Sequence, residues 1–298
     1  MTAHTPPADS SLREIRAQLL TWYAAAHRDF PWRHTSDPYA VLVSEVMLQQ
    51  TQASRVADRF PKFMERFPTA AALAAADDHD VLAAWSGLGY NRRALALRRT
   101  AAIVAARGWP ADVPSLEKLP GIGPYTARAL ASLAFGQAVG VVDTNVRRWL
   151  VRRLRTNPTG ASGLQAMADA LARAGDPADA SAWTHATMEF GAAICTSRTP
   201  GCGSCPIAAG CPSRGTAGLV PVPRQARFQG SDRARRGAVL RLLSRAAGHN
   251  LTLATARRHC PADFGRIVEG LEREGLAHRS GGRLLLGGRK EPAATIGA

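Results

Sequence analysis

The chain has 298 residues, of which 46% are hydrophobic and 20% charged, a globular composition with enough material for two or three domains. Its formal net charge is +15 at pH 7, and arginine carries almost all of it because lysine occurs only at positions 62, 118 and 290. This charge favours an anionic partner such as DNA, RNA or a membrane surface. No apolar stretch approaches the roughly 20 residues of a membrane span, and the N-terminus lacks a secretion signal. We therefore expect a cytoplasmic protein without membrane attachment.

The N-terminal part predicts a loose tail over residues 1–9 and a helix that begins at Ser10 or Ser11 and ends near residue 27. The next segment, Phe30-Pro31-Trp32-Arg33, is irregular, aromatic and basic. Two interpretations of it stay open. It is either a loop packed by its tryptophan or a platform at the wall of a ligand groove.

A helix that Pro38 opens is apolar through Leu48 except for one acid, Glu45. Burial among apolar side chains raises the pKa of a carboxyl group, which makes Glu45 a candidate general acid. The alternative is a glutamate on the helix face that pairs with an arginine. The segment that follows contains Gln50 and neighbouring amides, which are able to hydrogen-bond base edges.

Residues 53–107 predict short helices over 53–67, 70–75, 81–85 and 91–107. A glycine turn, Gly87-Leu88-Gly89-Tyr90, lies between the last two. Tyr90 either inserts between stacked bases or caps a hydrophobic core. Arginines in the next helix supply charge for phosphate binding, or form an ordinary exposed basic face; they are Arg92, Arg93, Arg98 and Arg99.

The central motif is Leu119-Pro-Gly-Ile-Gly-Pro-Tyr-Thr-Ala127, a tight turn between two helices. Pro124 suits the first position of the second helix, which runs to residue 135. The free N–H groups of Gly121 to Gly123 at that helix start form a ready phosphate site, to which a cation held by the turn's carbonyls could add. An ordinary corner between helices is the alternative.

A short extended run over residues 138–142 places Asp143 at the start of a helix over 145–154. Asp143 is well suited to cap that helix, and the helix dipole and N–H donors would hold its carboxylate ionised. Capping and a catalytic role are compatible. Further helices are predicted over 163–174 and 180–193.

Four cysteines follow within 17 residues, in the pattern C-x6-C-x2-C-x5-C. In an intracellular chain such a set indicates a bound metal centre, and the spacing alone does not separate a zinc site from an iron–sulfur cluster. The four are Cys195, Cys202, Cys205 and Cys211. A fifth, Cys260, is isolated and predicted to be a small buried apolar residue.

The C-terminal part begins with a linker rich in proline, glycine and arginine, which runs to residue 227. Helices are predicted over 232–246, 252–259 and 261–275, with a β-hairpin over 276–286. Three helices and a hairpin form a winged-helix pattern, a module that binds DNA or contacts proteins. The tail after residue 288 is expected to be disordered.

Taken together and in order, these motifs resemble those of the MutY-type adenine DNA glycosylases of the helix–hairpin–helix superfamily. The resemblance covers about residues 10–214. It implies a mainly α, two-lobed fold, with a six-helix domain over 28–135 and a cluster domain formed by 10–27 and 136–214. A linker over 215–227 and the winged-helix-like module over 228–288 complete the expected domains. The four cysteines would hold a [4Fe–4S] cluster.

The resemblance also implies the substrate, which is double-stranded DNA with adenine opposite 8-oxoguanine or guanine. It further implies that the adenine is flipped out of the duplex for excision. Two carboxylates suit this chemistry, because the leaving purine needs an acid and the oxocarbenium-like sugar needs a negative charge. Glu45 would protonate the adenine and Asp143 would stabilise the cation, with Asn145 beside it. The expected DNA contacts are Trp32, Arg33, Leu48, Gln50, Thr51, Tyr90, Gly121 and Gly123.

Position 125 distinguishes between related glycosylases. Endonuclease III-type relatives carry a lysine after the hairpin that attacks the sugar, whereas this chain has Tyr125, so no obvious amine is present for a Schiff base. We expect a monofunctional, monomeric enzyme on the bacterial nucleoid. Many relatives end in a Nudix-like domain that reads 8-oxoguanine, and residues 222–290 do not resemble such a domain. How strictly this protein requires 8-oxoguanine rather than guanine opposite the adenine is therefore left open. The alternatives are a related glycosylase with another base preference and a non-catalytic DNA-binding or redox-sensing protein.

Overall fold

The computed structural model describes residues 9–154, 161–218, 227–260 and 263–288. The chain divides into two compact units, each built from two separate stretches. Unit 1 comprises Met1–Glu45 and Trp109–Arg224, and unit 2 comprises Val46–Gly108 and Gln225–Ala298. The domain boundaries expected from the resemblance differ from this division and stay a prediction.

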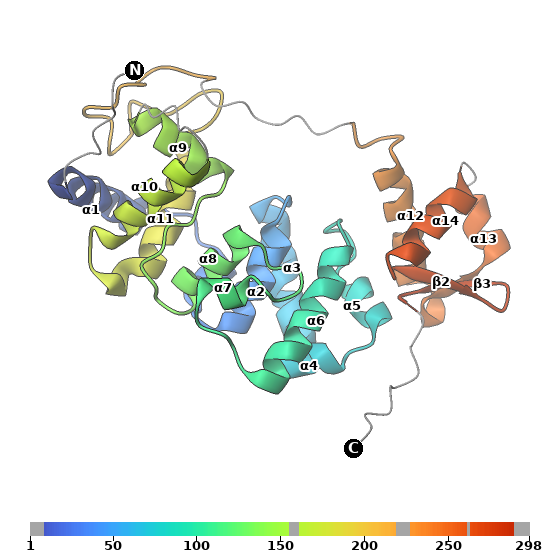
Figure 1. The fold of residues 1–298 in the computed structure, drawn as a ribbon. Helices are drawn as coiled ribbons and strands as arrows, with labels where there is room; N and C mark the ends of the chain where they lie inside the picture. Colours follow the sequence, from blue (N-terminus) through green and yellow to red (C-terminus); the bar gives the residue numbers. More distant parts are fainter. Residues whose placement is uncertain (1–8, 155–160, 219–226, 261–262, 289–298) are drawn as a thin grey trace. The chain divides into compact units, whose positions relative to one another are not determined.

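Unit 1 consists of helices and connecting loops, without a strand among its described residues (Figure 1). Its helices bury one apolar core, in which leucines and aromatic residues of α1, α9, α10 and α11 pack together; examples are Leu19, Trp149, Leu171 and Phe190. Helix α11 contacts α1, α8 and α9, so it is the central helix of the unit. The elements of unit 1 are α1 (Asp9–Ala26), the 3-10 turn η1 (Pro31–His34), most of α2 (Pro38–Leu48), α7 (Val113–Leu116), α8 (Pro124–Leu133), α9 (Thr144–Leu154), α10 (Ala161–Arg173), η2 (Pro177–Asp179) and α11 (Ala180–Ala193).

Unit 2 begins with four helices and ends with the C-terminal module, a small α/β structure. The helices are α3 (Ala53–Arg66), α4 (Ala70–Ala75), α5 (Asp78–Ala84) and α6 (Arg92–Arg107). The module contains α12 (Asp232–Arg245), η3 (Ala247–His249), β1 (Asn250–Thr252), α13 (Leu253–His259), α14 (Phe264–Arg273), β2 (Ala277–Ser280) and β3 (Arg283–Leu286). Three helices and a hairpin were expected here, and they are present.

The sheet of the C-terminal module has three antiparallel strands in the order β1-β3-β2. Strand β3 pairs with β2 in the predicted hairpin, with Ala277 opposite Leu286, and with β1, where Leu251 lies opposite Leu284. The sequence analysis missed β1 because its three residues are too few to show an alternating pattern. The strand connects α12 to α13 and completes the winged-helix arrangement.

Contacts with α5 hold the C-terminal module within unit 2. Gly287 packs so closely on α5 that a Cβ there would lie 3.1 Å from the Cβ of Asp78. The Ser244 hydroxyl donates to Ser86 Oγ over 3.3 Å, and His249 Nε2 lies 3.9 Å from the carboxylate of Asp80. The module is therefore packed against the helical part of the unit.

The turn between α7 and α8 forms as predicted. Gly121 has a φ of +77°, a conformation that suits glycine, and Pro124 occupies the start of α8. Leu119 and Ile122 are buried beneath the turn, which leaves the glycines outside. The described helices include none that is both long and apolar enough to cross a bilayer.

Candidate active site and cysteine centre

Glu45 lies in the last turn of α2, and only 4% of its surface is exposed. The helix around it is almost wholly apolar and buried, with Val41, Leu42 and Val43 each at 2% exposure or less. Burial raises the pKa of Glu45 to about 7, an effect that the nearby charge of Asp143 increases and the hydroxyl of Tyr125 opposes. Glu45 is therefore divided between its acid and its carboxylate form near neutral pH.

Tyr125 is the second residue of α8, directly after the glycine turn. The residue is half-buried, and its hydroxyl lies 3.8 Å from Met188 Sδ. Burial, together with the charges of Glu45 and Asp143, raises its pKa well above 10, so the phenol stays neutral. The second oxygen of Glu45, Oε2, is buried and has no hydrogen-bond partner among the described residues.

Asp143 caps α9 as the sequence predicted. Its carboxylate accepts a hydrogen bond from the backbone N–H of Val146 over 2.6 Å and another from Asn145 Nδ2 over 2.7 Å. These donors lower the pKa of Asp143, as expected, but burial outweighs them and raises the pKa above its usual value. The electrostatic interactions show that Glu45, Tyr125 and Asp143 are neighbours.

Arg148 connects this site to the cysteine segment. Its Nη2 donates to Asn145 Oδ1 over 2.9 Å and to the carbonyl of Gly191, while Nε donates to the carbonyl of Cys195 over 2.7 Å. The sequence analysis did not single out Arg148 or Gly191. A Cβ at Gly191 would lie 2.6 Å from the Asn145 carbonyl oxygen, so only glycine allows α11 to approach the start of α9 this closely.

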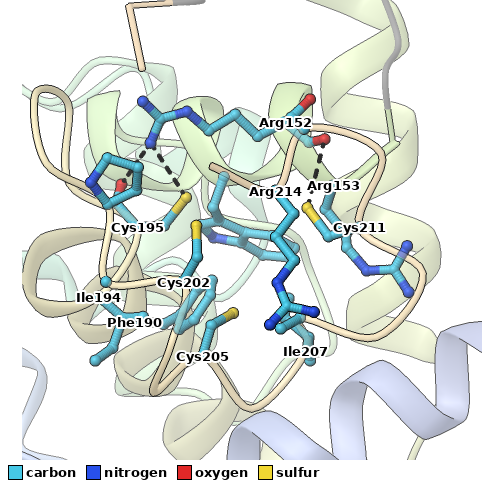
Figure 2. Close-up of a pocket in the computed structure, with 15 residues that line it drawn as sticks. Arg152, Arg153, Phe190, Ile194, Cys195, Cys202, Cys205, Ile207, Cys211 and Arg214 are labelled. Carbon is cyan, nitrogen blue, oxygen red and sulfur yellow. Dashed lines mark hydrogen bonds between the residues drawn. The ribbon is translucent and has the colours of Figure 1, made fainter. Parts of the chain in front are cut away.

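The four cysteines surround a pocket that begins where α11 ends, and their sulfur atoms face it (Figure 2). Trp149, Phe190 and Ile207 form its apolar wall. Arg152 Nη1 lies 3.5 Å from Cys195 Sγ, and the backbone N–H of Gly215 donates to Cys202 Sγ over 3.4 Å. Four sulfurs with N–H donors around an apolar pocket fit a thiolate-bound metal centre, and their arrangement is consistent with an iron–sulfur cluster.

The residues expected to contact DNA differ in their surroundings. Gly121 and Gly123 are exposed, and a Cβ at Gly123 would meet nothing within 4 Å, so a phosphate can approach that backbone. Trp32 is 5% exposed and stacks on Phe30 with ring centroids 4.8 Å apart. This packing agrees with the interpretation of the segment as a loop anchored by its tryptophan.

Arg33 is also occupied by structural contacts. Its guanidinium pairs with Glu189 over 2.7 Å, and 8% of its side chain is exposed. Arg28 pairs with the same carboxylate over 2.6 Å. Two arginines thus neutralise a glutamate that is itself 1% exposed. Trp32 is buried and Arg33 half-buried, so both side chains have structural partners here, and their contact with DNA stays a prediction.

In unit 2, two of the expected base contacts have an unusual backbone. Gln50 and Tyr90 have φ values of +56° and +47°, a left-handed conformation that few residues other than glycine adopt. Tyr90 is 40% exposed and Gln50 is also exposed, whereas Leu48 and Thr51 are partly buried. Such conformations are held in place by their surroundings and gather at functional sites.

Arg93 supplies much of that support. Its guanidinium donates to the carbonyls of Val46 and Gln49 over 2.6 Å each, and to that of Gly89 over 2.9 Å. It thereby ties the segment with Gln50 to the turn with Tyr90. The sequence left Arg93 and Arg98 open between phosphate binding and an ordinary exposed basic face; in the structure Arg98 pairs with Asp78 over 3.1 Å and Arg93 serves as this internal clamp. Neither role is visible in the sequence, because it depends on carbonyls far along the chain.

Sequence comparison defines the family. Residues 43–173 match the model of the HhH-GPD superfamily base excision DNA repair proteins. An adenine DNA glycosylase from Mycolicibacterium smegmatis is 41% identical over 292 residues, which cover 92% of this chain and 96% of that protein. The adenine DNA glycosylase of Mycobacterium tuberculosis is 43% identical over 249 residues, covering 79% and 80%. This chain belongs to the adenine DNA glycosylase family.

A solved structure extends the likeness to the fold. A thermostable thymine-DNA glycosylase superposes with a TM-score of 0.63 and 28% identity, over 69% of this chain and 98% of that one. The expected helix–hairpin–helix glycosylase fold is therefore confirmed. The turn at Gly121 lies between α7 and α8 and precedes Tyr125, while Asp143 lies directly before α9.

Proposed function

We propose that this protein is a monofunctional DNA glycosylase that removes adenine paired with 8-oxoguanine or guanine. The observation that carries the proposal is the group formed by Glu45, Tyr125 and Asp143, in which a buried carboxyl with a pKa of about 7 lies near a second carboxyl. Two carboxyl groups in different environments are what N-glycosidic hydrolysis needs. The family relationship supplies adenine as the base.

Glu45 acts first as the general acid. Its protonated form gives its proton to N7 of the flipped adenine, the C1′–N9 bond breaks, and the bonding electrons leave with the purine. The carboxylate that remains then accepts a proton from the water that attacks C1′. A group whose pKa is near the working pH performs both steps well, and burial provides such a pKa here.

Asp143 stabilises the positive charge that develops on the sugar, or bonds to it transiently. Its two hydrogen bonds, from Val146 and Asn145, fix the orientation of the carboxylate before substrate arrives. A charge oriented in advance costs no reorganisation during the reaction. Asn145 is in turn held by Arg148, so the position of Asp143 rests on two successive contacts.

Tyr125 supports the monofunctional assignment. Its phenol is kept neutral by burial and interacts with Glu45, which suits a residue that orients the acid rather than one that attacks the sugar. Without an amine at this position a Schiff base with the opened sugar has no nucleophile. The product is then an intact strand with an abasic site.

The base opposite the adenine is read, in this proposal, by Leu48, Gln50 and Thr51, while Tyr90 inserts into the stack. The exposure of Gln50 and Tyr90 and their left-handed backbone support such a role. The exposed N–H groups at Gly121 and Gly123 are placed at the start of α8, where a backbone phosphate is favoured.

Cys195, Cys202, Cys205 and Cys211 would hold a [4Fe–4S] cluster. The four cysteines line one pocket after α11, and the family relationship supports an iron–sulfur cluster as its occupant. Such a cluster would crosslink the loop after α11. A broad visible absorption with four irons per chain tests this, and stoichiometric zinc would contradict it.

The deciding experiment is single-turnover cleavage of duplexes with adenine opposite 8-oxoguanine, guanine, cytosine or thymine, each with and without alkali. We expect strand cleavage only after alkali, and only for the first two pairs. Cleavage without alkali would indicate a lyase. Release of another base, with adenine left intact, would overturn the assignment of substrate.

A further inference from the structure

The C-terminal module and the turn that carries Tyr90 line one groove of about 1100 Å³, all of it within unit 2. One wall contains Gln50 and the segment Gly87–Asn91. The other contains Phe228 and the outer face of α12. The module therefore adds residues to the surface that holds the expected base contacts.

The charge of this groove is strongly positive. Its lining includes six arginines and a single acid; they are Arg55, Arg92, Arg93, Arg233, Arg236, Arg241 and Glu274. Glu274 is paired with Arg236, so it neutralises one arginine only. A concave surface with this balance attracts a polyanion.

Two aromatic rings stand beside the arginines. Tyr90 and Phe228, at 40% and 51% exposure, are the large hydrophobic side chains exposed within the described part of the chain. The guanidinium of Arg233 lies 5.9 Å from the ring centre of Tyr90 and 5.4 Å from that of Phe228. Arg233 Nη1 also donates to the Tyr90 hydroxyl over 2.9 Å. One arginine of the module thus brings a second aromatic ring to the expected intercalating tyrosine.

Two arginines near the start of α14 are neutralised by acids. Helix α14 is the third helix of the module, the position of the DNA-reading helix in helix-turn-helix proteins, but its Arg266 is paired with Asp232 over 2.8 Å. Arg235 is likewise paired with Asp263 over 2.8 Å. The groove, by contrast, is lined by six arginines and one acid.

We propose that Phe228 and Arg233 are DNA-binding residues of this enzyme, with Phe228 stacking on a base and Arg233 contacting a phosphate of the strand opposite the adenine. Open aromatic rings beside arginines are the arrangement that binds unstacked bases and the neighbouring backbone. The strand is assigned because Gln50 and Tyr90, on the same groove, are the proposed readers of the opposite base. The inference rests on the proposed function for that assignment alone.

The test measures the affinity of the full chain for a duplex that contains a non-hydrolysable adenosine analogue opposite 8-oxoguanine. Phe228→Leu keeps an apolar side chain but removes the ring, and we expect about a tenfold loss of affinity. Arg233→Gln should weaken binding and lower the slope of log K against log salt by about 0.9, the contribution of one phosphate contact. The matched control is Arg258→Gln, the same charge change on α13 outside the groove, which should leave both values unchanged.

The slope of log K against log salt distinguishes a phosphate contact by Arg233 from a role in holding Tyr90 in place. If Arg233 only held Tyr90 in place, Arg233→Gln would weaken binding with an unaltered slope, and the phosphate contact would be refuted. Wild-type affinity in both variants, or an equal loss in Arg258→Gln, would overturn the proposal. Thermal melting of each variant serves as the control for whether the module remains folded. Failure of the wild type to excise adenine would refute the proposed function instead, while the affinity of the variants would still test the surface.

Discussion

The carboxylate site of unit 1 and the arginine-lined groove of unit 2 use opposite physical means. At the first, Glu45 is buried and Asp143 and Tyr125 are half-buried, and the nearby Arg148 binds backbone carbonyls and an amide oxygen. At the second, the rings of Tyr90 and Phe228 are exposed beside arginines that line a groove. Chemistry that depends on a raised pKa requires enclosure, whereas capture of a polyanion requires exposure. The net charge of the chain therefore does not locate its DNA surface, because many arginines are structural.

The comparison is tested most severely by Glu45→Gln. This change keeps the size of the side chain but removes the proton donor, and we expect adenine excision to fall by about 10³- to 10⁴-fold in single turnover. Affinity for the duplex should change by less than about twofold, because the residue belongs to the enclosed site. The control Glu14→Gln, on the exposed face of α1, should excise normally. A loss of affinity as large as the loss of excision would contradict the assignment of Glu45 to catalysis rather than DNA binding.

Asp143→Asn separates catalysis from capping. Asparagine caps helices about as well as aspartate, so the melting temperature should stay within about 2 °C. Loss of the negative charge should slow excision by about 10²- to 10³-fold. The measurements are single-turnover kinetics and thermal unfolding. A large drop in stability with little effect on rate would show that the carboxylate is mainly structural.

Arg93→Gln tests the second region, the arginine-lined groove of unit 2. The arginine clamps three carbonyls beneath Gln50 and Tyr90, and a shorter neutral side chain is unable to span them. We expect about a tenfold loss of affinity for an 8-oxoguanine duplex and a smaller loss for an undamaged one. Arg107→Gln, at the far end of the same helix α6, provides a control with the same charge change. A uniform loss for both duplexes would mean that Arg93 acts through charge alone.

The smallest effect is expected for Tyr125→Phe, read as a change in pH dependence. The hydroxyl lowers the pKa of Glu45, so its removal should raise that pKa above its present value of about 7. Because protonated Glu45 is the acid, excision declines as pH rises through this pKa, and the decline should move to higher pH in the variant. A shift to lower pH, or an unchanged profile, would contradict the proposed contact.

The sequence predicted most helices because their apolar periodicity is local, and it located Glu45, Asp143 and the cysteines because their motifs are contiguous. It did not predict the roles of Arg93 and Arg148. Each of these arginines binds carbonyls whose position depends on tertiary packing. The sequence showed the donors that lower the pKa of Asp143 but not the burial that raises it, since local donors are visible in a sequence and desolvation is not.

The placement of Trp32 shows the same limit. An aromatic and basic segment fits either a core or a ligand platform, and the choice depends on Phe30 and on Glu189, a residue more than 150 positions away. The groove beside Phe228 was not predicted from the sequence, for a related reason. It exists only because the C-terminal module packs on α5, so its two walls come from stretches that the sequence places more than 130 residues apart.

Arg148 has a consequence for how this protein can evolve. Its planar group reaches Asn145, Gly191 and Cys195 at once, so it acts as a spacer of fixed length between the helix that Asp143 caps and the cysteine loop. A lysine carries the same charge but only one nitrogen, and it is unable to hold three partners in fixed directions. Sequence drift at this position should therefore be confined to arginine, even though the side chain need touch neither DNA nor the departing base.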